Sequence, residues 1–458
     1  MRQILAKQLS LVPAPINHPR AQELAKMSAI LEEMPEAAAL VHADLIRRSE
    51  GKQADPTKGR KGMTGEQVLR AMIVKQMNNY SYEELAFHLS DSNTYRSFCR
   101  IGLEEKPIDV SVLKKTLKRV RAETWEAINR KLVLHAVANG VETGQKIRTD
   151  CTVVESNIHS PTDSSLLLDC VLVLVRIMEE ASEDFGCSFN DHSRRAKRRA
   201  MGILNAKTNE QRLPLYRDLL KVTDKTVKSA ERIAQELEKA QPANMKQMLH
   251  AGKLATELRH YTEMAKRIIS QTQRRVLYGE SVPAEEKLVS IFEPHTDIIV
   301  KDRRETLYGH KICLSAGASG MVTDVVVEKG NPADSTLATR MIERQKELYG
   351  KPPRQVTFDG AFSSKENLAD IKALGVQDVA FTKARGLSIE EMVKNSRVYR
   401  YLRNFRAGVE GIISFLKRTF GLDCCTWSGL ESFKAYVHGS VLACNLLLMA
   451  RHLLAASG

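Results

Sequence analysis

The 458-residue sequence contains no uninterrupted apolar run long enough to cross a lipid bilayer. Its longest apolar runs, such as residues 170–175, fall far short of the roughly 20 residues that a membrane-spanning helix needs. The first 20 residues lack the apolar core of a signal peptide. Eight cysteines in 458 residues are too few for a disulfide-stapled scaffold. These absences exclude a small secreted fold and predict a protein of the reducing cytoplasm with no membrane partner.

The charge of the chain is unbalanced. Lys and Arg number 69 against 55 Asp and Glu, which gives a net charge of +14. Hydrophobic residues at 43% and charged residues at 27% are ordinary values for a globular protein, so global disorder is excluded. The length predicts about two to four domains. The positive excess favours a polyanionic partner, with nucleic acid as the first candidate.

The N-terminal part of the chain is predicted to be a lead-in followed by helices. Residues 21–46 have helical spacing, and residues 51–61 form a polar linker containing Gly and Pro. Two capping boxes, in each of which Gln or Glu follows a Ser or Thr by three residues, predict helix starts at Thr64 and Ser81. We therefore expect a compact helical domain of helix-turn-helix type over residues 62–140.

The end of this region, from Ser111 to Gly140, is predicted to be one long helix. Lys114, Lys118 and Arg121 would then fall on one helix face, at positions i, i+4 and i+7. A solvated face of a surface helix explains this arrangement. Contacts with DNA phosphates explain it too, because several cations beside a helix-turn-helix suit a DNA backbone. Both interpretations stay open.

Helical patterns return in the middle of the chain, over residues 165–285. Apolar steps of three and four in residues 215–239 and 243–276 predict two long helices that pack as an antiparallel hairpin. A dense basic run, SRRAKRR, precedes them. A solvated helix end and a nucleic-acid contact both explain its arginines, which are Arg194, Arg195, Arg198 and Arg199.

Strand patterns flank this helical block. Residues 146–156 alternate and are β-branched, and strand character resumes in 288–296, 310–317 and 321–330. Helices and strands then alternate. This order predicts an α/β domain of ribonuclease-H-like fold, with a mixed sheet and an all-α insertion after its first strand. The predicted organisation is a lead-in with linker (1–61), a helical DNA-binding domain (62–140), a catalytic domain in two parts (141–164 and 286–458) and a helical insertion (165–285).

Three acids stand where carboxylates from different elements can meet. Asp150 lies within the first strand, Asp359 at the carboxyl end of a later strand and Glu410 on the last helix of the alternating region. Hard divalent cations such as Mg²⁺ prefer carboxylate oxygens as ligands. Two such ions about 3.5–4 Å apart suit an in-line displacement at phosphorus.

Other acids compete for this role, since the chain has 55 of them. Asp324 is also a strand acid. Asp163 and Asp334 begin predicted helices, and we interpret both as N-caps. Spacing alone therefore does not select the metal ligands.

The last of these helices, predicted over residues 403–420, carries cations beside Glu410. At about 100° per residue, Arg403, Arg406 and Lys417 fall within about 40° of this glutamate. Intrahelical ion pairs on a solvated face explain the stripe, because Arg406 and Glu410 are four residues apart. A metal ligand flanked by phosphate-binding cations explains the same stripe.

In combination these motifs resemble the DDE transposases of bacterial insertion sequences, in the group with a Tyr–Arg–Glu–Lys signature on the last catalytic helix. The signature reads Tyr, two residues, Arg, three residues, Glu, six residues, Lys. Arg406, Glu410 and Lys417 match its last three members, and Arg403 stands at the Tyr position. TDCTVVESNIHSPTDSSLL and FDGAFSS resemble the segments that carry the family's first and second Asp.

The resemblance implies a DNA transposase. Asp150, Asp359 and Glu410 would be its catalytic residues and would hold two Mg²⁺ or Mn²⁺ ions. Metal-activated water would cut one DNA strand at an element end, and the exposed 3′-hydroxyl would attack target DNA. The implied partners are double-stranded DNA, as terminal inverted repeats and target, and a second copy of the chain in a homodimer on DNA. The implied location is the nucleoid in the bacterial cytoplasm.

The cations named above are the predicted DNA-binding residues. Two alternatives to a transposase remain. One is a nuclease on the same fold that cuts DNA without joining it. The other is a DNA-binding protein, derived from a transposase, that has lost catalysis.

Overall fold

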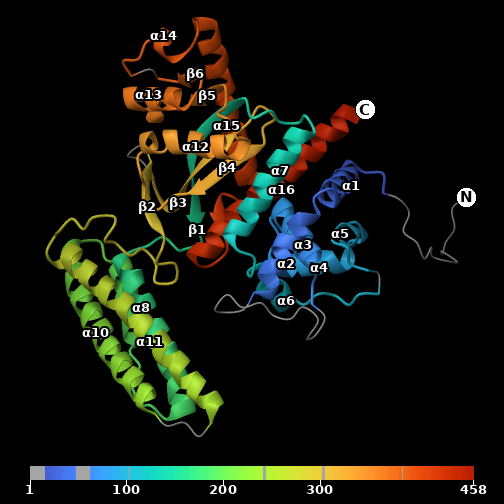
Figure 1. Ribbon diagram of the computed structural model, residues 1–458. Coiled ribbons are helices and arrows are strands. Elements are labelled where there is room, and N and C mark those ends of the chain that lie inside the picture. Colours follow the sequence, from blue (N-terminus) through green and yellow to red (C-terminus); the bar gives the residue numbers. More distant parts are fainter. Residues whose placement is uncertain are drawn as a thin grey trace, which may run out of the picture. The chain divides into compact units, whose positions relative to one another are not determined.

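The computed structural model describes residues 16–47, 62–102, 104–240, 244–301, 305–383 and 385–457 (Figure 1). The chain divides into two compact units, one formed by residues 1–155 with 311–458 and the other by residues 156–310. The predicted linker at 51–61 lies outside the described residues.

Helices make up the N-terminal part of the first unit, and both predicted capping boxes are present. The Gln67 N–H donates to Thr64 Oγ1 at 3.1 Å, and Ser81 and Glu84 cap the next helix in the same way. The helical spacing of residues 21–46 corresponds to the first two helices, which pack in one core with the others. The helices are α1 (Pro19–Glu32), α2 (Pro35–Ile46), α3 (Gly65–Asn78), α4 (Tyr82–Asp91), α5 (Asn93–Phe98), α6 (Val110–Leu117) and α7 (Ala122–Ala138).

The prediction of one long helix from Ser111 to Gly140 was wrong, because the chain breaks between α6 and α7. The buried carboxylate of Asp44, on α2, accepts from the Arg121 N–H at 3.0 Å and from the Thr124 hydroxyl at 2.6 Å. An N-terminal helix N–H that finds an acceptor outside the helix is satisfied, so α7 begins there. Lys114, Lys118 and Arg121 therefore do not share one helix face.

A mixed sheet with the predicted leading strands makes up most of the rest of this unit; its residues 297–310 fall within the second unit. The strand order is β2–β3–β1–β5–β6, with β4 paired to β3 and β7 paired to β1. β3 runs antiparallel to β2 and β4, whereas β1, β5 and β6 run parallel. The strands are β1 (Lys146–Ser156), β2 (Asp297–Lys301), β3 (Glu305–Ala316), β4 (Val322–Val327), β5 (Gln355–Phe358), β6 (Asp378–Phe381) and β7 (Cys424–Cys425).

Helices alternate with the later strands, as the sequence predicts. Asp334 begins a short 3₁₀ helix, but its side chain does not cap it; it pairs with Lys311 at 2.9 Å instead. The elements are η3 (Asp334–Thr336), α12 (Ala338–Tyr349), η4 (Gly360–Phe362), α13 (Lys365–Ala373), α14 (Ile389–Met392), α15 (Ser396–Phe420) and α16 (Leu430–Ser457).

The side chain of Asn445 joins the closing helix α16 to the sheet. Its amide accepts from the Val322 N–H at 2.8 Å and donates to the Val322 carbonyl at 2.7 Å, as a neighbouring strand would. It also donates to Asn129 of α7 at 2.8 Å. Helices α7 and α16 lie side by side (Figure 1). The N-terminal helices and one face of the sheet thus share a single hydrophobic core.

Helix α16 is the one described helix that is long and apolar enough, by length and composition, to cross a membrane. In its most apolar window, 61% of the residues are buried inside the structure. Core helices of soluble proteins pass the same test. The contacts of α16 with α7, α3 and α1 are those of a core helix.

The second unit contains the predicted helical block. Its two longest helices, α10 (Asn209–Lys239) and α11 (Met245–Thr272), pack against each other and against α8 (Asp163–Phe185). A shorter helix, α9 (Ser193–Asn205), lies between α8 and α10 in the chain, and a π-helical turn, η2 (Gln273–Leu277), follows α11. Their apolar stripes meet in a core of their own.

Two sequence predictions in this unit were wrong. The expected strand at 288–296 is irregular, and β2 starts after it, because the Ser290 hydroxyl accepts from the N–H groups of Phe292 and Glu293, both at 3.1 Å. This local turn replaces the strand hydrogen bonds. Thr162, rather than Asp163, is the N-cap of α8, and Asp163 pairs with Arg275 at 3.0 Å.

Candidate active site

The parallel pairing of β1 and β5 brings two of the predicted acids to neighbouring positions. Thr149 of β1 lies opposite Phe358 of β5. Asp150 and Asp359 each follow their paired residue directly, so they lie one position further along adjacent strands. Glu410 comes from α15, which packs against β5 and β6.

The guanidinium of Arg406 contacts all three carboxylates. Nη2 lies 2.7 Å from Asp150 Oδ2 and 3.8 Å from Asp359 Oδ1, and Nη1 lies 2.7 Å from Glu410 Oε1. The three acids are thus brought together at one cation, across two strands and a helix. We name this group of four residues the carboxylate cluster.

The pKa values of the two aspartates are shifted in opposite directions. Burial raises the pKa of Asp150 to about 6, against the lowering influence of the Arg406 charge. Burial also acts to raise the pKa of Asp359, but hydrogen bonds from Thr382 and from the Gly360 N–H hold it below its usual value. Neighbouring ionisable groups with pKa values pushed apart are typical of functional sites.

Two further residues of the site follow β6, and the sequence analysis missed them. Thr382 donates its hydroxyl to Asp359 Oδ1 at 2.8 Å. Lys383 covers Gly360, where a Cβ would lie only 2.7 Å from the Lys383 Cβ, and its charge also lowers the pKa of Asp359. Their position at the carboxyl end of the strand beside β5 is a signal that the sequence contains.

The donor set of the cluster suits a divalent cation. Three carboxylates offer the hard oxygen ligands that Mg²⁺ and Mn²⁺ take. Three carboxylates close together repel one another unless a positive charge lies between them. In this structure the Arg406 guanidinium supplies that charge. Arg406 Nε is buried without an acceptor among the described residues, so its place is not fixed by a complete set of hydrogen bonds.

Asp324, the competing strand acid, lies outside the cluster. Its carboxylate is buried and receives Arg344 in a two-pronged contact, with Nη2 at 2.7 Å from Oδ1. Arg344 also reaches Glu126 of α7 at 2.6 Å. This arrangement ties α7 and α12 to the sheet, and the partner of Asp324 is Arg344 rather than the Arg406 that Asp150 contacts.

The remaining cations of the α15 stripe have separate surroundings. Arg403 is exposed. Lys417 pairs with Asp423 at 3.3 Å rather than with a member of the cluster. Of the three cations predicted to lie beside Glu410, Arg406 is the one that the described contacts pair with it.

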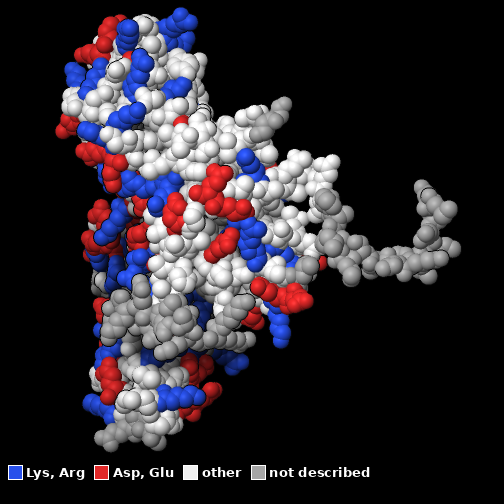
Figure 2. All heavy atoms as spheres, turned by 45° about the vertical axis from the view of Figure 1, so that its right-hand side comes forward, with Lys and Arg blue, Asp and Glu red and all other residues white. Residues whose placement is uncertain are grey.

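The other predicted DNA-binding cations lie elsewhere. Lys114 is exposed on α6, whereas Arg121 pairs with Asp44 at 2.8 Å. On α9, Asp218 holds Arg195 and Arg199, while Arg194 and Arg198 are exposed. Figure 2 shows Lys and Arg interspersed with Asp and Glu on the face in view, so the positive excess does not gather into one basic stripe there.

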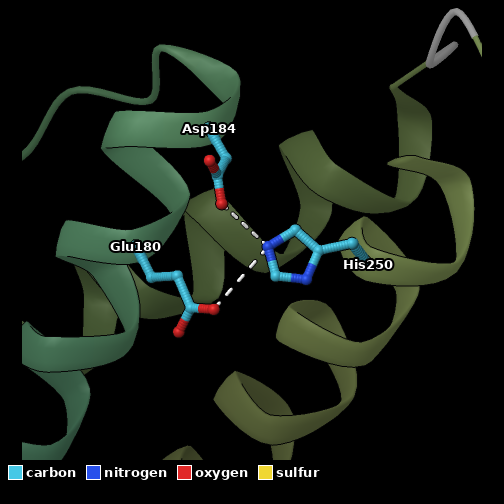
Figure 3. Close-up of side chains that lie close together, drawn as sticks. All are labelled: Glu180, Asp184 and His250. Atoms are coloured by element: carbon cyan, nitrogen blue, oxygen red, sulfur yellow. Dashed lines mark hydrogen bonds and ion pairs between the residues drawn. The ribbon is translucent and has the colours of Figure 1, made fainter. Parts of the chain in front are cut away.

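A separate group on the second unit combines a histidine with two acids. His250 of α11 directs Nε2 toward Asp184 at 2.8 Å and Glu180 at 3.6 Å, both on α8 (Figure 3). The donor atoms lie within 4.8 Å of one another, as a metal site requires. Both acids are about half exposed, and Asp184 is already hydrogen-bonded to the imidazole, so a surface contact between two helices explains the group.

Comparisons with known proteins identify the class to which this fold and cluster belong. A family model described as "Transposase DDE domain" matches residues 296–446, which include Asp359 and Glu410. A second, described as "Transposase domain (DUF772)", matches residues 18–119. The two matches together place the chain in the family of DDE transposases of the insertion-sequence type. Membership implies that it binds DNA and takes part in DNA transposition.

One curated relative is an uncharacterized protein, ORF8 in the nfe locus of Rhizobium meliloti. It is 28% identical over 141 residues, which cover 29% of this chain and 67% of the relative. No solved structure matches the chain. The ribonuclease-H-like nature of the sheet therefore rests on the family match and on the strand order described above.

Proposed function

We propose that the chain is an active, metal-dependent transposase that cuts DNA at the element ends and joins the resulting 3′-hydroxyl to target DNA. The meeting of Asp150, Asp359 and Glu410 at Arg406 is the observation that carries the proposal. Side chains from two strands and a helix converge on one point, and together they form a ligand set for Mg²⁺ or Mn²⁺.

Each member of the cluster has a role in this reaction. When bound, two divalent ions activate the attacking oxygen and stabilise the leaving oxygen. Asp150, Asp359 and Glu410 would hold these ions, and Thr382 would keep Asp359 in orientation through its hydrogen bond. Arg406 balances the three carboxylates in the free protein. It becomes available to a DNA phosphate when another cation takes its place.

The cations outside the cluster are proposed to bind DNA. Exposed Arg403 and the Lys417 side chain lie on the same helix as Glu410 and would contact phosphates beside the cut strand. The helices around α3 to α7, proposed to include a helix-turn-helix, would recognise the terminal repeats, with Lys114 and Lys118 on phosphates. Arg194 and Arg198 of α9 would contact DNA held by a second copy in a homodimer.

Two alternatives differ in what they produce. A nuclease on the same fold would release cut ends and never join them. A catalytically silent DNA-binding protein would bind the repeats and cut nothing. The intact carboxylate cluster favours an enzyme over the silent protein.

The test uses the full-length protein and labelled linear DNA that carries the inverted repeats flanking its own gene. With Mg²⁺ or Mn²⁺ we expect cuts at the repeat ends and labelled ends joined to a supercoiled plasmid; with EDTA we expect neither. Asp150→Asn, Asp359→Asn and Glu410→Gln should each reduce cutting at least about 100-fold, since each removes a metal ligand. Repeat binding in gel shifts should persist.

A matched control is available on α16. Glu431, like Glu410, is 68% exposed and pairs with a cation of its own helix. Glu431→Gln should therefore cut and join like the wild type. Cutting without joining would establish the nuclease alternative, and equal loss of binding and cutting in the three variants would mean that the acids act through folding.

A further inference from the structure

Strand β1 carries a second functional side chain two residues before Asp150. Because side chains alternate along a strand, Lys146, Arg148 and Asp150 share one face. Arg148 is buried, with 9% of its surface exposed. Its Nη1 donates to the carbonyl oxygen of Phe405 at 3.0 Å, and its guanidinium carbon lies 4.5 Å from the centre of the Phe405 ring. Phe405 directly precedes Arg406 on α15.

Helix α15 has a glycine, Gly408, where the Arg148 guanidinium packs against it. At Gly408 an added Cβ would lie only 2.1 Å from Arg148 Nη1 and 3.1 Å from its Cζ. Beyond the helix's own backbone and neighbouring residues, no atom of the described residues lies within 4 Å of a Cβ added at Gly411, one turn further along. An Ala side chain at Gly408 would therefore displace the Arg148 guanidinium from its place against α15, whereas helix geometry alone would favour Ala at both positions.

A second contact of β1 with α15 lies beside the first. The Lys146 ammonium lies 4.4 Å from the ring centre of Tyr401 and 4.8 Å from that of Phe405. β1, which carries Asp150, therefore contacts about two turns of α15, which carries Arg406 and Glu410. Cation–ring contacts of this kind are strongest where water is excluded, as it is around Arg148.

We propose that Arg148 is a positioning residue that sets where α15 sits on β1 and thereby how closely Glu410 and Arg406 approach Asp150. The proposal rests on the proposed function only in treating these acids as metal ligands. The described contacts of Arg148 are with Phe405 and Gly408 of α15, and none joins it to the three acids. It acts through the carbonyl of Phe405 and through the surface at Gly408.

A purely structural arginine and a positioning arginine differ in what their loss changes. Loss of a structural contact lowers the free energy of unfolding and leaves the folded site unaltered. Loss of a positioning contact alters metal affinity in molecules that remain folded, because ligand spacing decides affinity for a cation that demands near-ideal geometry. Mn²⁺ binding to the free protein measures this directly, without any need for catalysis.

The experiment compares Mn²⁺ affinity, by paramagnetic resonance of unbound Mn²⁺, in full-length Arg148→Ala, Arg148→Lys, Gly408→Ala and Gly411→Ala. Denaturant unfolding confirms that each variant is folded under the assay conditions. We expect Arg148→Ala and Gly408→Ala to weaken Mn²⁺ binding at least about tenfold, since misplaced supporting residues commonly cost 10–100-fold in metal affinity. Arg148→Lys should recover most of it by donating to Phe405, and Gly411→Ala should match the wild type.

The double variant Arg148→Ala/Gly408→Ala tests the link between the two positions. Once the guanidinium is gone, Ala at Gly408 meets no obstacle, so its additional effect should be less than about twofold. Wild-type Mn²⁺ affinity in Arg148→Ala, or equal harm from Gly408→Ala and Gly411→Ala, would overturn the proposal.

The outcomes separate this proposal from the proposed function. Mn²⁺ binding that depends on Arg148 in a protein that neither cuts nor joins DNA would uphold the positioning role and reject the transposase reaction. A wild-type protein that cuts and joins DNA, with Mn²⁺ affinity indifferent to Arg148, would do the reverse. A wild type that binds no Mn²⁺ would reject both.

Discussion

The guanidinium of Arg406 lies 2.7 Å from the carboxylate of Asp150, although 256 positions separate the two residues in the chain. The same group reaches Glu410 and Asp359, so one positive charge faces three negative ones. Like charges this close repel strongly where water is partly excluded. Arg406 is therefore the counter-ion that permits three acids to share a site in the free protein.

Replacing Arg406 by Ala should destabilise the protein in a way that metal reverses. In EDTA we expect the free energy of unfolding to fall by about 1–3 kcal/mol, a range reduced for the exposure of Glu410 and Asp359. Mn²⁺ can supply the missing charge, and at about 100 times its Kd it adds about 2.7 kcal/mol. Thermal unfolding with and without Mn²⁺ measures both effects.

The control for this prediction is Arg418→Ala, on the same helix, whose described hydrogen bonds go to Ser414 one turn earlier. Its unfolding should respond to Mn²⁺ as the wild type does. An Arg406→Ala protein as stable as the wild type in EDTA would show that the carboxylates do not need this counter-ion.

Metal binding should weaken in mild acid because protons compete for Asp150. Burial raises the pKa of this aspartate to about 6, above its usual value, so its protonated form accumulates as the pH falls through 6. Mn²⁺ requires the ionised form, and its affinity should be about tenfold lower at pH 5 than at pH 7.5. Titration calorimetry at both pH values checks this.

The sign of the effect can be tested with Arg406→Ala. The charge of Arg406 lowers the pKa of Asp150, so its removal should raise that pKa and move the loss of Mn²⁺ affinity to higher pH. Mn²⁺ affinity that is constant between pH 5 and pH 7.5 would contradict a role for Asp150 as a ligand.

The sequence predicted the elements whose signals are local. The strand over residues 146–156, the capping boxes at Thr64 and Ser81 and the helical hairpin of the insertion all appear in the structure. The predicted candidate acids also lie together, since the ends of neighbouring parallel strands meet at one sheet edge. Their catalytic role stays a prediction.

What the sequence could not reveal depends on residues far apart in the chain. The helical pattern continues through Lys118 to Arg121 without Pro or Gly, and only Asp44, 77 positions earlier, ends it. Likewise, nothing local distinguishes Arg195 and Arg199 from Arg194 and Arg198, until Asp218 from the next helix pairs with the first two. The periodicity of a sequence predicts which residues share a helix face, but it does not predict which residues of other elements they pair with.

This difference on α9 predicts two kinds of charge-reversal variant. Arg194→Glu/Arg198→Glu changes exposed side chains, so the protein should stay as stable as the wild type while losing complexes that hold two DNA ends. Arg195→Glu/Arg199→Glu places two acids beside Asp218 and should lower the stability only slightly, because exposed pairs contribute little. Gel shifts and denaturant unfolding of both variants separate the effects. Unchanged paired-end complexes in the first variant would remove the DNA role of the basic run.

Asn445→Ala should show how strongly the helical core and the catalytic sheet depend on each other. The substitution leaves the buried N–H and carbonyl of Val322 and the amide of Asn129 without their partner, at about 1–3 kcal/mol for each unsatisfied group. We expect the free energy of unfolding to fall by about 3 kcal/mol or more.

The control is Asn395→Ala, which removes an exposed helix cap and should lower the free energy of unfolding by only about 1 kcal/mol. Because one core spans α7, α16 and β4 and holds both Trp125 and Trp427, tryptophan fluorescence and the far-ultraviolet signal of the whole chain should shift together. If the Asn445 variant instead unfolds in two separated steps, the helices and the sheet fold as independent domains, and a fragment of residues 62–140 can then be used alone to measure repeat recognition.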